Sequence, residues 1–236
     1  MATQRQIMSE PVATQRSDQK DAVVNFLATK CLVPTSAWLD DFLQQPRSSV
    51  PLSSLQQTAL YRLLTTDLTV STQRSPSSLL PAQVAQSSIV ELQVPGPIIV
   101  QLLDIEDIGS SAWSQIETIE SQERGETTRG NQVIRTLPDE NGEAATTKSR
   151  GPHKLTLQDA AGTKVYAFQM QPIAKIELGC AIGLKLSLKN IVVARGILLL
   201  NPSNTVVLGG KIEAADRAWH AGRKQRLQQK IASLEG

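Results

Sequence analysis

Two hydrophobic periods divide the chain into a helical block and a strand-forming block. Over residues 18–68 apolar side chains recur every three or four positions, as Leu55, Ala59 and Leu63 do, which is the period of amphipathic helices. Prolines divide this stretch into three such segments. A bundle of three short helices buries little apolar surface by itself, so we expect it to dock on the rest of the chain.

From residue 89 onward the pattern alternates with a period of two, which is typical of half-buried strands. In "LKLSLK" the leucines face one side, and Lys185 and Lys189 face the other. "KLTLQDAAGTKVYAFQM" contains two alternating runs around a turn, which predicts a β-hairpin. An OB-fold, a five-stranded β-barrel, is the most economical interpretation. Another small barrel or a sandwich would give the same pattern.

Together these patterns predict an α+β chain, a three-helix bundle followed by a barrel. The predicted parts are a disordered arm over 1–17, a three-helix domain over 18–68, a linker over 69–88 and an OB-fold domain over 89–236 that ends in a helix over 211–235. The linker is rich in Ser, Gln and Pro, a composition typical of surface loops.

A long polar segment, about 106–151, separates the predicted strand "PIIVQLLDI" from the strand "HKLTLQD". So long a loop inside a compact domain is uncommon unless it has a function. It carries nine acidic and five basic side chains, and low hydrophobicity favours mobility in the free chain. Apolar residues at roughly helical spacing mark its first third: Ile105, Ile108, Trp113, Ile116 and Ile119. We expect Trp113 to anchor this segment on a partner. The alternative is that Trp113 packs back onto its own barrel.

The motifs of common enzymes and cofactor-binding proteins are missing from the sequence. It has no phosphate-binding loop, nucleophile elbow or dinucleotide fingerprint, and His153 and His220 lack metal-ligand spacing. Cys31 and Cys180 lie far apart, and we interpret both as reduced core thiols. No window is apolar enough for a membrane helix. We therefore expect a binding or scaffold protein that is not an enzyme, holds no cofactor or metal and spans no membrane.

Direct binding of single-stranded DNA is a second hypothesis, because OB-folds often bind it through a basic groove and stacked aromatic rings. Tyr166 and Phe168 lie two positions apart, on one face of one strand, and we favour core packing for them over base stacking. The closing helix is basic and offers Arg223, Lys224 and Arg226 as contacts to DNA. The net charge of only +2 does not by itself indicate a nucleic-acid partner.

Several motifs, in the same order along the chain, resemble the RecQ-mediated genome instability protein family. They are "LLTTDL", "VQLLDIEDIGSSAWSQIETIE", "YAFQMQPI" and "GILLLNPSNTVVLGG", and the resemblance covers about residues 20–235. It implies a three-helix domain and an OB-fold with a long insertion between its first two strands. Because animal members continue into a long tail with a second barrel, the chain resembles the short, fungal-type form.

The resemblance also implies a function and a set of contacts. In that family the barrel docks on a type IA topoisomerase III, the insertion reaches into the DNA gate of that enzyme, and the complex with a RecQ helicase dissolves double Holliday junctions. It therefore implies a nuclear protein. The implied partner-binding residues of the insertion are Ile108, Trp113, Gln115, Ile116 and Ile119. On the barrel surface we expect Lys185 and Lys189 to make further contacts.

Overall fold

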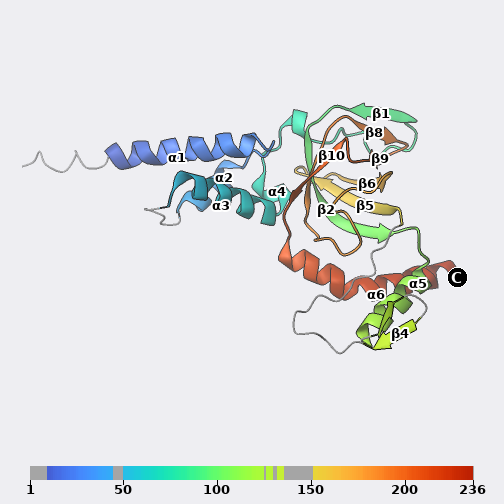
Figure 1. The fold of residues 1–236 in the computed structure, drawn as a ribbon. Coiled ribbons are helices and arrows are strands. Elements are labelled where there is room, and N and C mark those ends of the chain that lie inside the picture. The colour runs from blue at the N-terminus through green and yellow to red at the C-terminus, as the bar shows by residue number, and fades with distance from the viewer. Residues whose placement is uncertain (1–9, 45–49, 125, 130–131, 136–150, 236) are drawn as a thin grey trace, which may run out of the picture.

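A helical part and a curled sheet lie side by side, and two further helices lie along one end of the sheet (Figure 1). The computed structural model describes residues 10–44, 50–124, 126–129, 132–135 and 151–235. The described part is therefore α+β, with most of its helical structure before the sheet and one long helix after it.

The helical part contains the three predicted helices and a fourth of one turn. They are α1 (Glu10–Ala28), α2 (Ser36–Gln44), α3 (Leu52–Thr65) and α4 (Leu68–Ser71). The first helix begins at Glu10, within the predicted arm over 1–17. Pro11 is compatible with this start, because proline is well tolerated in a first helical turn. The core of this bundle is made of buried apolar side chains from all four helices, among them Val23, Leu39, Phe42, Leu63 and Leu68.

Cys31 does not belong to that core, although its spacing from Leu27 indicated that it does. The helix ends at Ala28, and Cys31 has a φ of 59° and is exposed. The prediction of a core thiol at this position is wrong. The apolar spacing continues to Cys31, but the helix ends about one turn before it.

The sheet consists of eight strands in the order β1-β8-β9-β6-β5-β2-β7-β10. The strands are β1 (Glu91–Val94), β2 (Ile98–Asp107), β5 (His153–Asp159), β6 (Lys164–Gln169), β7 (Lys185–Leu188), β8 (Ile191–Ala194), β9 (Ile197–Leu200) and β10 (Thr205–Gly209). Only β6 and β9 pair in parallel, and the other neighbours are antiparallel.

The count differs from the five strands that we predicted, because three of five chain segments are interrupted. The breaks lie at 95–97, 189–190 and 201–204, where proline cannot donate to a ladder or, as at Asn190, the backbone has a positive φ. If β1–β2, β7–β8 and β9–β10 are each taken as one segment, the pairing runs through all five segments and returns to the first. The sheet thus closes on itself as a small barrel.

The predicted linker contributes to the core of this barrel. Leu80 is 7% exposed and Val84 is 1% exposed, and both belong to the apolar cluster inside the sheet. The Ser- and Pro-rich stretch therefore carries two anchoring residues across the surface.

β2 connects the bundle to the insertion. Near its start, Ile99 belongs to the core of the bundle, and the buried side chain of Gln101 accepts a hydrogen bond from the backbone N–H of Leu68 (2.9 Å). Its last residue, Asp107, begins the insertion. The expected docking of the bundle on the barrel is confirmed, and it occurs along the first half of this strand.

The insertion leaves the barrel between β2 and β5 and contains a helix and a hairpin. α5 spans Ala112–Glu123, and β3 (Glu126–Arg129) pairs antiparallel with β4 (Gln132–Arg135). The apolar spacing noted in the first third of the insertion does form a helix, whereas the mobility of the segment in the free chain stays a prediction. Residues 136–150 of the predicted insertion lie outside the described residues.

The closing helix α6 spans Glu213–Glu235 and covers the end of the barrel where the insertion begins (Figure 1). Its first turn is fixed by Asp216, which accepts a hydrogen bond from the backbone N–H of Ile182 (2.8 Å) and pairs with Lys211 (3.1 Å). Trp219 on the next turn is 6% exposed and belongs to the barrel core.

Candidate functional site

The two ends of the insertion cross at Gly109 and Gly151. A β-carbon on Gly109 would lie 2.9 Å from the Cα atom of Gly151, so a side chain does not fit there. Asp107 closes the turn, because its carboxylate accepts hydrogen bonds from the backbone N–H groups of Gly109 (2.8 Å) and Ser110 (3.2 Å). The insertion therefore leaves the barrel through a narrow, hydrogen-bonded neck.

Gln115, which we predicted as a partner contact, fixes α5 to this neck. The side-chain amide of Gln115 donates hydrogen bonds to the backbone carbonyls of Asp107 (3.0 Å) and Ser110 (3.1 Å). Ile116 on the next position is 6% exposed. In this structure both side chains are buried, and neither is exposed to a partner.

The other predicted contacts of the insertion are more accessible. Trp113 is 65% exposed and Ile108 is 44% exposed, whereas Ile119 is half-buried. The alternative that Trp113 packs back onto the barrel is wrong, since most of its surface faces solvent. Trp113 and Ile108 are thus the predicted contacts that a partner can reach, although their binding role stays a prediction.

Ion pairs join α5 to α6. The Nζ atom of Lys224 lies 3.0 Å from a carboxylate oxygen of Glu123 and 3.1 Å from one of Glu120. Hydrogen bonds to Glu123 and Glu120 raise the pKa of Lys224 above its ordinary value. We predicted Lys224 as a DNA contact, and the structure pairs its charge within the molecule.

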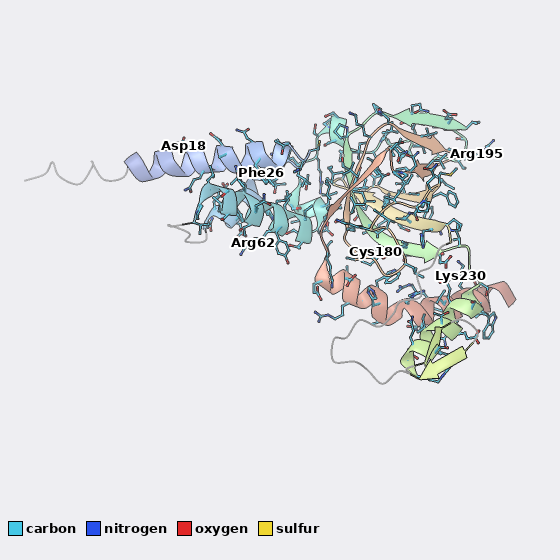
Figure 2. The ribbon with its side chains drawn as sticks, viewed as in Figure 1. Asp18, Phe26, Arg62, Cys180, Arg195 and Lys230 are labelled. Atoms are coloured by element: carbon cyan, nitrogen blue, oxygen red, sulfur yellow. The ribbon has the colours of Figure 1, made fainter. Side chains whose placement is uncertain are left out.

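Glu106 connects the barrel to the far end of α6. Its carboxylate pairs with Lys154 (2.9 Å) on β5 and with Lys230 (3.0 Å) on α6, and Figure 2 labels Lys230 where α6 passes the start of α5. Burial raises the pKa of Glu106, but the hydrogen bonds from Lys154 and Lys230 outweigh it, and the net shift is downward.

The remaining two predicted DNA contacts lie over Trp219. Its indole N–H donates a hydrogen bond to the carboxylate of Asp104. The guanidinium carbons of Arg226 and Arg223 lie 5.3 Å and 5.9 Å from the indole centroid, within the range of a cation–π contact. Arg226 also donates to the backbone carbonyl of Trp219 (2.8 Å). Burial lowers the pKa of Arg223.

These elements enclose a groove of about 800 Å³ between the end of β2, the start of α5 and one face of α6. Its apolar lining includes Ile105, Trp113, Leu178, Trp219, Leu227 and Ile231. Sequence reasoning missed this groove. A signal was present, because Trp219, Leu227 and Ile231 keep multiples of four along the closing helix and so share one face.

Lys185 does not lie on the surface. It is fully buried, and its ammonium donates a hydrogen bond to the backbone carbonyl of Gly183 (2.8 Å). Burial lowers the pKa of Lys185 to about 8. The prediction of a surface contact is wrong because this part of the sheet lies under the bundle. Lys189 follows the strand and is exposed, and its role stays a prediction.

Tyr166 and Phe168 face outward from the barrel. Tyr166 is 52% exposed, and Val165 and Ala167 fill the core in their place. Our preference for core packing is therefore wrong, since this strand buries Val165 and Ala167, whereas Tyr166 is exposed and Phe168 is only half-buried. The ammonium of Lys154 lies 4.5 Å from the ring centroid of Tyr166.

The described residues contain no group of three or more His, Cys, Asp and Glu side chains that could hold a metal. His153 lies inside the barrel, where its Nδ1 atom is 2.6 Å from the side-chain oxygen of Gln169. None of the helices in the described ranges is both long and apolar enough to span a bilayer.

Comparison with known proteins matches both parts of the fold. The family model "RMI1, N-terminal OB-fold domain" matches residues 80–223, and "RMI1, N-terminal helical domain" matches residues 26–71. The chain is 28% identical over 204 residues to the RecQ-mediated genome instability protein 1 of Schizosaccharomyces pombe. This match covers 79% of this chain and 85% of that protein.

A second relative, the Xenopus laevis protein of the same name, is 31% identical over 138 residues. That match covers 58% of this chain but 23% of the Xenopus protein, so it is confined to one part of a longer chain. The family models together match both the bundle and the barrel described above. The chain therefore belongs to the RecQ-mediated genome instability protein 1 family.

Proposed function

We propose that this chain is a non-catalytic scaffold subunit that binds a type IA topoisomerase III and acts with a RecQ-family helicase in the nucleus. In this proposal the insertion engages the DNA gate of the topoisomerase and promotes decatenation and the dissolution of double Holliday junctions. Membership of the family supports a scaffold role in genome stability, and the names of both relatives refer to a RecQ-mediated process.

The observation that carries this proposal is the exposed indole of Trp113 on a helix with a fixed base. Trp113 is 65% exposed, while Gln115 and Lys224 tie the same helix to the neck and to α6. A large aromatic side chain that is held in place but not covered is suited to be an interface anchor, because it loses little conformational freedom on binding.

Such an anchor can act on a gate through differential binding. A type IA topoisomerase cuts one strand and opens a gate for another. A subunit that contacts the open gate more favourably than the closed gate shifts the equilibrium towards opening, by no more than the difference in its binding free energies. A difference of about 1.4 kcal/mol changes the ratio of open to closed gates about tenfold.

A single substitution tests this role with the full chain and purified topoisomerase III. We expect Trp113→Ala to co-elute with the topoisomerase but to lose stimulation of decatenation of linked single-stranded circles. Glu117→Ala provides a matched control, because Glu117 is an exposed residue of the same helix. Unchanged decatenation by Trp113→Ala would exclude the gate role, and a wild-type chain that does not co-elute would exclude the topoisomerase as partner.

Direct binding of single-stranded DNA by the barrel is a second candidate function. The outward orientation of Tyr166 and Phe168 favours it, since exposed rings on this face can stack on bases. It predicts an affinity for an oligothymidylate that falls steeply with salt and is lost in a Tyr166→Ala variant. Salt-insensitive or undetectable binding would leave the scaffold role as the function of the chain.

A further inference from the structure

The carboxylates of the groove between β2, α5 and α6 are already satisfied by groups of the same molecule. Asp104 accepts a hydrogen bond from the indole of Trp219. Asp107 accepts bonds from two backbone N–H groups and from the Ser110 hydroxyl (2.8 Å). Glu106 pairs with two lysines, one of which, Lys230, is the lysine of the groove lining. Each of these carboxylates therefore already has hydrogen-bond or ion-pair partners within the molecule.

The two arginines of the groove are in the opposite situation. Within the described part of the chain neither Arg223 nor Arg226 forms a salt bridge, and their closest partners are the ring and the carbonyl of Trp219. The charge of Asp107 favours the protonated form of Arg223, and the charge of Arg226 opposes it. The two guanidinium groups therefore lack an ion-pair partner among the described residues, which favours a ligand that brings a carboxylate or phosphate to them.

The rest of the groove is apolar and continuous with the exposed anchor. Leu227 and Ile231 lie one turn apart on α6 and both contribute to the lining, and Trp113 lies on the rim. A volume of about 800 Å³ is within the range of sites that enclose several side chains. Apolar side chains one turn apart, beside a cation, form a surface complementary to an amphipathic helix with an acidic residue.

A protein segment fits this groove better than a nucleic acid does. Trp219 is 6% exposed and already has arginines over its ring, so a base has no free face on which to stack. Three carboxylates line the same groove, from Asp104, Glu106 and Asp107, and they would repel a continuous phosphate backbone. A single carboxylate beside Arg226 avoids that repulsion.

We propose that this groove binds an acidic, amphipathic segment of the partner protein. Its carboxylate meets Arg223 and Arg226, and its apolar side chains lie on Leu227 and Ile231. The inference rests on the proposed function, because the segment is assigned to topoisomerase III. In this arrangement the groove supplies affinity, whereas Trp113 on its rim supplies the contact to the gate.

Affinity measurements with the full chain and purified topoisomerase III test the groove directly. We expect Leu227→Glu and Arg226→Glu each to raise the Kd about tenfold or more, as changes at central interface residues do. Gln228→Glu is the matched control, since Gln228 is exposed on the same helix and outside the groove, and we expect its Kd to stay within about twofold. If the wild-type chain binds the topoisomerase and both groove variants bind it equally tightly, the groove is not the binding site. The proposed function would then stand without this inference.

Cross-linking identifies the bound segment without depending on the folding of the groove variants. A photoreactive phenylalanine analogue at Gln229, a residue of the groove lining, is expected to attach to an acidic, amphipathic segment of the topoisomerase. Attachment to added oligothymidylate instead would show a nucleic-acid site. A complex that forms without any attachment at this position would also overturn the proposal. If the wild-type chain binds no topoisomerase, the proposed function and this inference fail together.

Discussion

Lys185 of the barrel and Asp67 of the bundle interact electrostatically across the boundary between the two parts. Burial lowers the pKa of Lys185 to about 8, and the charge of Asp67 opposes that shift. Burial raises the pKa of Asp67, but hydrogen bonds from Thr69 and Gln101 and the charge of Lys185 lower it overall. The docked bundle thus encloses an ionisable pair, which makes its stability dependent on pH.

We expect Lys185 to contribute a rise in stability above pH 8. The unfolded chain holds this proton up to the ordinary pKa of 10.5, whereas the folded chain loses it near 8. The folded state therefore binds fewer protons in that window, and the free energy of unfolding rises with pH. Relative to Lys185→Met, the wild-type chain gains about 3 kcal/mol between pH 7.5 and 10.5. Urea denaturation of both chains at each pH measures the gain, and a difference independent of pH would contradict it.

The ion pairs between α5 and α6 predict a charge-swap rescue. Lys224→Glu places like charges beside Glu120 and Glu123, and we expect it to loosen α5 and reduce the stimulation of decatenation. Adding Glu120→Lys and Glu123→Lys restores opposite charges and should restore the stimulation. Amide hydrogen exchange in α5 provides a readout without the topoisomerase. Loss of activity that the swap does not restore would indicate that Lys224 contacts a partner instead.

Two neighbouring glycines separate the effect of a backbone angle from that of a close contact. Gly209 and Gly210 have φ values of 97° and 96°, but only at Gly210 would a β-carbon meet another atom, the carbonyl oxygen of Leu64 at 2.3 Å. We expect Gly209→Ala to cost about 1–3 kcal/mol of stability through backbone strain. Gly210→Ala should cost clearly more, because it also pushes the bundle off the barrel. Equal shifts in thermal unfolding would show that the close approach is unimportant.

The two cysteines should differ strongly in reactivity. Cys31 is exposed, whereas burial raises the pKa of Cys180 to about 11 and so keeps its thiol protonated at neutral pH. With a disulfide reagent at pH 8 we expect one fast and one slow phase. Substituting Cys31→Ser should remove the fast phase. A fast phase that persists in this variant would place the reactive thiol at Cys180.

The period of the apolar residues was sufficient to predict the bundle, a strand-forming second part and the closing helix, but it left a barrel and a sandwich as alternatives for that part. It was not sufficient to predict what covers each element. Lys185 alternates with leucines as a surface residue does, and only the docked bundle makes it a buried one. Phe168 and Tyr166 show the reverse case, since they were expected in the core and face outward. Their strand has apolar residues on both faces, so its pattern does not determine which face is buried.

The candidate site illustrates the same limit. The sequence singled out Trp113 as a large aromatic residue in a polar segment, but it left open whether the side chain is exposed or packs on the barrel. The groove could not be predicted, since it arises where β2, α5 and α6 meet. Arg226 and Lys224 look alike in a basic helix, yet one lies over Trp219 and the other pairs with α5. Their partners lie far away in sequence, so local pattern could not distinguish them.

β2 has a mechanical consequence. It runs from Ile98 to Asp107 and is ten residues long, or about 30 Å at the usual rise per residue. Gln101 near its start lies under the bundle, and Asp107 at its end lies at the neck of the insertion. Its first part pairs with β7 and the rest pairs with β5, so each part of the strand belongs to a ladder. A load applied to α5 is therefore carried along one braced strand to the bundle. The neck of the insertion is thus connected to the bundle by a single continuous strand.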